Sequence, residues 1–401
     1  MRARQSRKHA LIRTPLSSER PLTNKAVPNV RLYSNARSLS VFHFAFFACS
    51  CTFLQVKCVR MGKGKMAVVL GAFYGLMVGS SLGAVSDEYA FQTSEFMRST
   101  QYRAPDAMDI ASADGAYSAP NIAWDEGGRV GTDWFIDEQH WADDVVCAGI
   151  AQNDVNAIQR GLLMFAWGFA QQQPDGSFLC TDQFHATAFF VEGVSHACLM
   201  LEKSPFARTY GQQIKTLKAQ VLKSARWMNE PSVAAAAAIT DAPFTHRRYL
   251  NGAALGETGV LCNVSDLIRA AAAYIATGES QQWSNGVNPE KGGWDSSYQA
   301  LGLKYAARYY FVVAQSQALS AMGINGENWE TTMILPSGAV SVVGNTRTGS
   351  CQERDHLGNC KGVSYDSVYE SFYQWYLISG DANYETLASK IFNYFLANVA
   401  S

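Results

Sequence analysis

The chain is poor in charged residues and lacks the spacings that bind metals. Of its 401 residues, 17% are charged and 48% are hydrophobic, which excludes an intrinsically disordered protein. Its 32 Gly and 11 Pro show no collagen-like or low-complexity bias. Neither a CxxC nor an HxxxH spacing occurs, so we expect no metal site, and we expect no cofactor. The length fits two or three domains or one repeat-built domain.

Acidic residues are nearly absent from the first part of the chain and plentiful in the rest. Residues 1–84 hold 13 Lys and Arg and one acidic residue, whereas residues 85–401 hold 20 Lys and Arg and 33 Asp and Glu. The formal charges of the two parts are therefore +12 and −13. The acidic part argues against nucleic acid as a partner, because phosphate binding depends on clustered Lys and Arg.

Residues 61–84 have the order of a secretory signal peptide. The short basic start MGKGKM is followed by an apolar run of roughly 15 residues and then by small residues. A membrane span needs about 20 apolar residues, so we expect a secreted protein with no stable membrane partner. Residues 1–60 are basic and Ser-rich. They are a transit or anchor segment, a disordered extension or, as we favour, a stretch upstream of a true start at Met61.

Secretion predicts disulfides, because it exposes cysteines to an oxidising environment. Six cysteines follow the expected signal peptide, and the pair that closes the short polar loop CQERDHLGNC, Cys351 and Cys360, is expected to be bonded. The other four can pair in three ways; they are Cys147, Cys180, Cys198 and Cys262. The sequon at Asn263 predicts N-glycosylation.

From Asp154 onward, apolar residues recur at helical spacing between short breaks that contain Gly, Pro or Asn. The expected helices cover residues 154–173, 185–202, 207–229, 246–260, 264–282, 296–322, 366–379 and 383–399. Several are apolar almost all round, which indicates packing on more than one side. The segment Thr332–Val343 predicts a small β-hairpin around Pro-Ser-Gly.

A weak internal repeat connects these breaks. The sequence QQPDGSF at 172–178 precedes DQFH at 182–185, QQWSNGV at 281–287 precedes DSSY at 295–298, and DSVY at 366–369 keeps only the second half. The three aspartates, Asp182, Asp295 and Asp366, are expected to cap the helices that follow. The ring-bearing residues of the first turns would then lie at helix N-termini; they are His185, Tyr298 and Tyr369.

Repeating helix pairs with such loops predict an all-α chain, an α/α toroid or incomplete barrel in which inner and outer helices alternate around a cleft. The stretch NPEKGGWDSSYQA at 288–300, with GNTRTG at 344–349, resembles secreted α/α-toroid polysaccharide lyases of the alginate and glucuronan type, over about residues 130–400. The resemblance implies a single catalytic domain at 85–401 that cleaves a uronic-acid polysaccharide by β-elimination. We expect it to act as a monomer.

A uronan lyase must offset the C6 carboxylate, remove the C5 proton and protonate the departing O4. The segment THRRY at 245–249 is the densest cationic cluster, and we expect His246 and Tyr298 to face one another across the cleft as the proton-transfer pair. Arg248 or Arg247 would offset the carboxylate. The alternatives are a surface helix start for the cluster and a packing role for Tyr298.

Further candidates for binding the polymer surround these residues. They are His185, Arg247, Asn288, Glu290, Lys291, Trp294, Asp295, Gln299, Arg347 and Tyr369. The basic members would have to overcome the charge of −13, which repels a polyanion at long range. For two of them a structural role competes: His185 as a core histidine and Asp295 as a helix cap.

Two other functions fit the same fold. Paired carboxylates from Glu192, Glu290, Asp295 and Asp366 would serve a glycoside hydrolase. A toroid without a coherent catalytic cluster would be a carbohydrate-binding protein.

The exported protein is predicted to begin near Ala84–Asp87 after translation from Met61, because the basic, apolar and small-residue order ends there. N-terminal sequencing of the secreted chain checks this. Finding residues 1–60 still attached would contradict it.

Overall fold

The structure is a computed structural model that describes residues 85–100, 115, 123–124, 130–131, 136–349, 351–354 and 359–400. All of these lie in the compact unit Val68–Ser401. The signal peptide expected at 61–84 and the extension at 1–60 lie outside the described residues.

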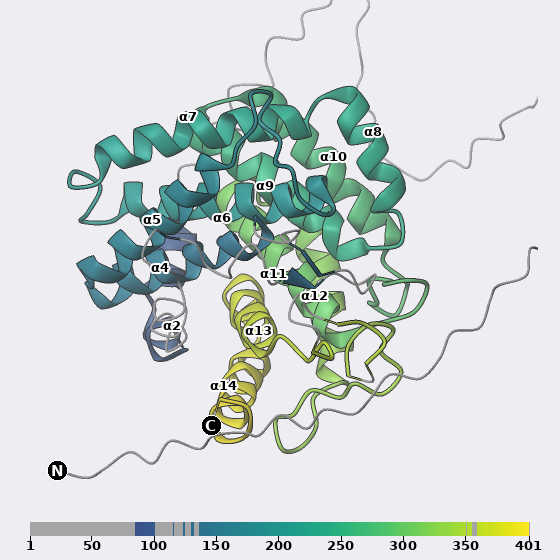
Figure 1. Ribbon diagram of the computed structural model, residues 1–401. Helices are drawn as coiled ribbons and strands as arrows, with labels where there is room; N and C mark the ends of the chain where they lie inside the picture. The colour runs from purple at the N-terminus through teal and green to yellow at the C-terminus, as the bar shows by residue number, and fades with distance from the viewer. Residues whose placement is uncertain are drawn as a thin grey trace, which may run out of the picture. The chain divides into compact units, whose positions relative to one another are not determined.

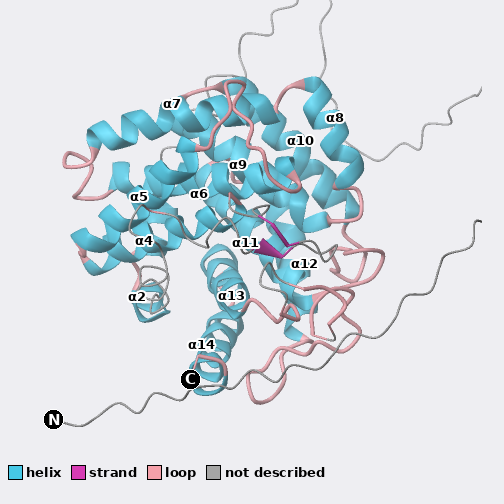
Figure 2. Ribbon diagram, viewed as in Figure 1, coloured by secondary structure: helices cyan, strands magenta, loops and turns pink. Residues whose placement is uncertain are grey.

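The described chain is almost entirely helical, and the few strand residues form one short antiparallel pair (Figure 2). Residues 85–92 are also helical. The named elements are α2 (Glu95–Thr100), β1 (Ala123–Trp124), β2 (Val130–Gly131), the 3₁₀ helix η1 (Asp137–Trp141), α4 (Ala142–Gln152), α5 (Val155–Ala170), α6 (Gln183–Lys203), α7 (Gly211–Met228), α8 (Pro231–Thr240), α9 (Thr245–Cys262), α10 (Ser265–Gln281), α11 (Ser296–Val312), α12 (Gln317–Thr331), α13 (Tyr365–Ser379) and α14 (Ala382–Asn398).

The helices form the two layers of an incomplete α/α toroid (Figure 1). The inner helices α4, α6, α9, α11 and α13 pack side by side in that order. The outer helices α5, α7, α10, α12 and α14 cover them: α7 packs on α6 and α9, α10 on α9, α12 on α11 and α13, and α14 on α13. The all-α toroid expected from the sequence is therefore confirmed.

The inner helices are buried on more than one side, as their apolar sequences predict. Helix α6 is long and apolar enough to cross a membrane, yet every residue of its most apolar stretch is buried inside the fold, as in the core helix of a globular protein. Helix α9 is buried over nearly its whole length. The polar side chains of these helices consequently face one another or the cleft, where the site lies.

The first two copies of the internal repeat form the same kind of turn, and each turn packs against an outer helix. In each copy a backbone N–H bonds a carbonyl four residues on, from Gln173 to Ser177 and from Trp283 to Val287. The glycines have positive φ, +100° at Gly176 and +93° at Gly286. A Cβ there would lie 2.5 Å from the Lys223 carbonyl oxygen of α7 or 2.2 Å from that of Asn325 in α12, so only glycine fits.

The predicted aspartate caps are correct once in three cases. Asp295 accepts hydrogen bonds from the N–H groups of Ser297 and Tyr298 and caps α11. Asp182 makes no such bond, because its backbone is left-handed at φ 45° and its carboxylate binds Arg247 instead. Asp366 lies inside α13, whose N-cap is Ser364.

One expected helix is divided in the structure, and helix α8 lies in a stretch where none was expected. The segment 296–322 is divided into α11 and α12, where Ser316 accepts a hydrogen bond from the N–H of Leu319 and caps α12. Helix α8 was not expected, because its alanine run has no apolar periodicity, although Pro231 occupies the first turn. The hairpin expected at Thr332–Val343 is present as an antiparallel bridge between Ile334 and Val340.

Two carboxyl groups of α12, Glu327 and Glu330, are buried with few hydrogen-bond partners. Burial raises the pKa of Glu327 to about 8, and Ser371 donates a hydrogen bond to it. Burial, followed by the neighbouring Glu327, raises the pKa of Glu330 well above its ordinary value, and neither of its side-chain oxygens has a hydrogen-bond partner. The fold holds these groups in the neutral form.

The contribution of Glu327 to the stability of the toroid is predicted to fall as the pH rises. The pKa of Glu327 is raised from 4.5 to about 8 on folding, so its stabilising contribution is complete below pH 4.5 and is lost as the pH rises through 8. The Glu327→Gln variant should match the unchanged protein at pH 5 and be more stable at pH 8. Denaturant unfolding at both values measures this, with exposed Glu202→Gln as the control. Equal stability of Glu327→Gln and the unchanged protein at pH 8 would contradict the assignment.

Candidate functional site

A cavity of about 510 Å³ lies along the inner helices. It is lined by Asp137, Glu138, His140, Trp141, Asp143, Asp144, His185, Phe189, Glu192, Arg247, Ser297, Tyr298, Leu301, Lys304, Tyr305, Arg308, Arg347, Thr348, Arg354, Lys361, Gly362, Val363, Ser364, Asp366 and Ser367. Four inner helices contribute residues from their first turns: α6, α9, α11 and α13. The partial positive charge of these N-termini favours an anionic ligand at this end.

Tyr298 lies in the cavity wall between two cations. Lys361 Nζ donates a hydrogen bond of 2.9 Å to the Tyr298 hydroxyl. The Arg347 guanidinium lies 3.5 Å from the centre of the Tyr298 ring. The phenol oxygen therefore sits where negative charge is stabilised.

His246 lies behind Tyr298 rather than across the cleft from it. The ring centres are 4.7 Å apart, His246 is only 1% exposed, and it is not among the lining residues. A close approach of α9 and α11 produces this contact, since a Cβ on Gly302 would lie 3.2 Å from the His246 Cα. The expected pair is thus brought together, but only Tyr298 reaches the cavity.

Glu290 holds His246 and Arg347 in place. One of its carboxylate oxygens accepts hydrogen bonds from the His246 backbone N–H at 3.0 Å and from Nδ1 at 2.7 Å. The other accepts from Arg347 Nη1 at 3.3 Å. Burial, partly offset by Glu290, lowers the pKa of His246, so the ring is neutral near pH 7, with Nδ1 donating and Nε2 without a hydrogen-bond partner.

His185 lines the cavity beside these residues. Its ring centre lies 6.0 Å from that of His246 and 4.8 Å from that of Phe189. Burial, followed by the charge of Arg247, lowers its pKa well below the ordinary value. His185 is therefore a neutral ring whose Nδ1 has no hydrogen-bond partner.

The two neighbouring arginines of α9 face different ways. Arg247 lines the cavity, and its Nη1 donates to Asp182 at 2.7 Å and to Asp241 at 2.8 Å. Arg248 does not line the cavity, and its Nη2 donates to the Ala238 carbonyl of α8. The structure therefore places Arg248 away from the cavity that Arg247 lines, because successive residues of a helix point about 100° apart.

Several other expected binding residues support the wall instead of lining it. Asp295 caps α11 and accepts bonds from the N–H groups of Arg347 and Thr348. Gln299 accepts from the Asn288 N–H and donates to the Gly286 carbonyl, which fixes the repeated turn to α11. None of Asn288, Asp295 and Gln299 is a lining residue.

The remaining three lie elsewhere. Tyr369 is buried against Phe392 and Phe395 in the core. Trp294 is 38% exposed outside the cavity and donates to the Val343 carbonyl. Lys291 forms an ion pair with Glu353.

The sequence interpretation missed important cavity residues. Lys304 and Arg308 are four residues apart on α11 and line the same cavity as Tyr298. Arg354 lies in the loop between Cys351 and Cys360, and Lys361 follows it directly. The predicted disulfide was the feature of the sequence that could have pointed to these two cations. Residues of η1 and α4 were missed because the helical pattern was followed only from Asp154 onward.

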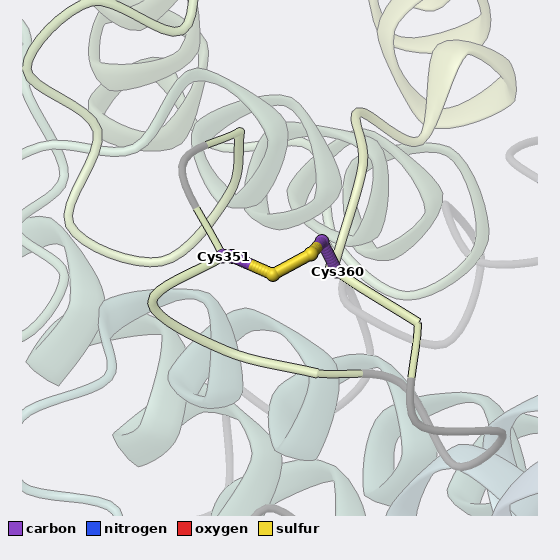
Figure 3. Close-up of a disulfide and its surroundings, with 2 residues drawn as sticks. All are labelled: Cys351 and Cys360. Atoms are coloured by element: carbon purple, nitrogen blue, oxygen red, sulfur yellow. A yellow bond between two sulfur atoms is a disulfide. The ribbon is translucent and has the colours of Figure 1, made fainter.

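The predicted bond between Cys351 and Cys360 is present (Figure 3). It closes the loop that supplies Glu353 and, directly after it, Lys361. Although burial opposes its charge, hydrogen bonds from Arg347 hold the pKa of Glu353 well below its ordinary value. The disulfide thus constrains residues that hold both cations beside Tyr298.

The other expected disulfides are absent among the described residues. No disulfide joins Cys147, Cys180, Cys198 and Cys262 to one another. Cys147 and Cys198 are buried within helices α4 and α6, and the Cys147 thiol donates to Asp143 at 3.4 Å. These four cysteines act as small buried or half-buried side chains.

Asp143, Cys147 and His196 bring three possible metal ligands within 4.8 Å of one another in the described part of the chain. Both His196 nitrogens already bond carboxylates, Nδ1 to Asp143 at 2.8 Å and Nε2 to Glu88 at 2.9 Å. Burial and Arg308 oppose the charge, yet Asp143 raises the pKa of His196 well above its ordinary value. The ring is a buried imidazolium between two carboxylates, which does not suit metal binding.

No protein-family model and no curated protein sequence matches the chain. Among solved structures, the chain is similar to a polysaccharide lyase with a TM-score of 0.45 and 11% identity. The match covers 79% of this chain and 46% of that one, so the chain spans about half the length of the lyase.

Removing the disulfide is predicted to loosen the cavity wall without unfolding the toroid. The double variant Cys351→Ser with Cys360→Ser should lose up to about 2 to 3 kcal/mol of unfolding free energy, as expected for a loop this short. Helix content by circular dichroism should stay unchanged, because the helices pack through α9 and α11 rather than through this loop. A large loss of helix at 25 °C would contradict this.

Proposed function

We propose that the protein is a polysaccharide lyase that cleaves a uronic-acid-containing polymer by β-elimination. The observation that carries the proposal is the Tyr298 hydroxyl in the cavity, hydrogen-bonded to Lys361 and covered by Arg347. This arrangement supplies the proton-transfer group and the positive charge that elimination next to a carboxylate requires. The disulfide is compatible with a secreted enzyme.

In the proposed reaction Tyr298 carries the proton. As a phenolate it takes the proton from C5 of the uronate, the electron pair of the C5–H bond becomes the C4–C5 double bond, and the C4–O4 bond breaks. The proton then passes from Tyr298 to O4 of the departing sugar. Lys361 and Arg347 lie where they stabilise negative charge on the phenol oxygen during this transfer.

The C6 carboxylate makes C5 acidic only when its negative charge is offset. Arg247 and Arg347 line the cavity next to Tyr298 and are the cations suited to this task. Neutral His185 lies beside them and offers a ring nitrogen to a sugar hydroxyl or carboxylate. These residues take the place that the sequence interpretation gave to Arg248.

His246 and Glu290 act as positioning residues in this proposal. Glu290 orients His246 and Arg347 together, and His246 packs against the Tyr298 ring from behind. The phenol is thereby fixed before substrate arrives, which lowers the entropic cost of reaching the transition state.

The glycoside hydrolase alternative has weaker support. Two of its four candidate carboxylates, Glu290 and Asp295, are fully buried and bond Arg347 and neighbouring backbone groups. Of the other two, Glu192 is paired with Arg308 at 2.6 Å, and Asp366 lines the cavity. In every pair drawn from these four carboxylates, at least one is buried in the wall or already forms an ion pair.

Tyr298→Phe is predicted to lower kcat/KM for elimination by roughly 10²-fold or more, because it removes the group that transfers the proton. The test follows ultraviolet absorbance of the unsaturated product across a panel of uronans. Tyr310→Phe is the matched control, since Tyr310 lies on the same helix outside the cavity and should keep full activity. Full activity of Tyr298→Phe would end the assignment.

A further inference from the structure

The cavity has an electrical polarity along its length. Its walls include one face of α6, with His185, Phe189 and Glu192, and one face of α11, running from Tyr298 through Leu301 to Arg308. Ten residues separate Tyr298 from Arg308, so the α11 wall is about 15 Å long. Both helices lead from the Tyr298 end toward the η1 and α4 end.

The Tyr298 end presents cations to the cavity. Arg247, Arg347, Arg354 and Lys361 are lining residues there. The carboxylates that pair with two of them lie behind the wall: Asp182 and Asp241 hold Arg247, and Glu290 and Glu353 hold Arg347. None of these four carboxylates lines the cavity.

The opposite end presents carboxylates. Those lining the cavity there are Asp137, Glu138, Asp143, Asp144 and Glu192, whereas Asp366 lies at the Tyr298 end, in the first turn of α13. The two cations that line this end are already paired, Arg308 with Asp143 and Glu192 and Lys304 with Glu370. Negative charge therefore exceeds positive charge on this wall.

The pKa shifts of two rings that line the cavity, His185 and Tyr305, agree with this division. After burial itself, the pKa of His185 is lowered by Arg247, Arg347 and Lys361 among its neighbours. That of Tyr305, about two turns along α11 from Tyr298, is raised by burial and by Glu192, Asp144 and Asp137, with Arg308 opposing. One end of the cavity is thus cationic and the other anionic.

A second, independent observation points the same way. Residues 85–401 carry a formal charge of −13, which repels a polyanion of uniform charge density. A chain in which only some sugars carry a carboxylate meets less of this repulsion.

Resting on the proposed lyase function, we infer that the sugar next to the reacting uronate carries no negative charge, so that the substrate is a polymer in which uronate alternates with a neutral or amino sugar. The uronate carboxylate occupies the cationic end beside Tyr298. Its neighbour occupies the anionic end, where carboxylates accept hydrogen bonds from hydroxyl or ammonium groups and Trp141, Phe189 and Tyr305 supply apolar ring surface. A second uronate at that end would meet like charges.

The test compares two polymers that share one uronate: a homopolyuronate and a chain in which that uronate alternates with a neutral sugar. Formation of the unsaturated product should be at least about tenfold more efficient, by kcat/KM, on the alternating chain. Raising the salt concentration should narrow the difference, because it screens the repulsion of the homopolymer. Equal or better cleavage of the homopolymer would overturn the inference and leave the lyase function standing. Absence of unsaturated product from every uronan would refute the lyase function itself.

Charge reversal at the anionic end is the second arm. Asp144→Lys should lower the preference for the alternating chain several-fold, whereas Glu230→Lys makes the same change of net charge at an exposed position outside the cavity and should leave the preference unchanged. If Asp144→Lys melts at a lower temperature, Asp144→Asn provides the same comparison with a smaller perturbation. An unchanged preference in a folded Asp144 variant would contradict the inference.

Discussion

The buried carboxylate of Glu290 is the contact on which the site depends. It is fully buried and accepts hydrogen bonds from two segments. The backbone and ring of His246 donate from the first turn of α9, and Arg347 donates from the 345–349 loop. A charge in such surroundings is stable only when every bond to it is made. The segments that meet at Glu290 therefore have little freedom to move independently, and Tyr298 is held between them.

The toroid makes this convergence possible. Inner helices that run parallel bring their N-termini to one end of the cleft, so residues distant in sequence become neighbours. Each N-terminus adds partial positive charge to the arginines and lysine already there. The other end carries the acidic residues of η1 and of the first turn of α4. Helix direction adds to the positive charge at the Tyr298 end, whereas side chains make the other end negative.

Much of the helical layer could be predicted from apolar spacing, because α5, α7, α9, α10, α13 and α14 have distinct breaks between them. The alanine run of α8 has no periodicity to detect, and the boundary between α11 and α12 contains neither Gly nor Pro. The types of residue in the site were largely predictable. Their orientation was not: whether Arg247 or Arg248 faces the cavity depends on the rotation of α9, which is set partly by its contact with Gly302. Lys361 comes from a loop 63 residues after Tyr298, and no local pattern connects the two.

The Gly176 and Gly286 turns have a consequence for how such a chain can change over time. Each turn touches the backbone of an outer helix, at Lys223 or Asn325, and side chains such as Ser224 add hydrogen bonds to it. Contact between main chains is the same whatever residues the outer surface carries. This part of the spacing between the two layers therefore does not depend on the residues of the exposed face. The outside of the toroid is free to diverge in charge while the end of the cavity that carries Tyr298 keeps its shape.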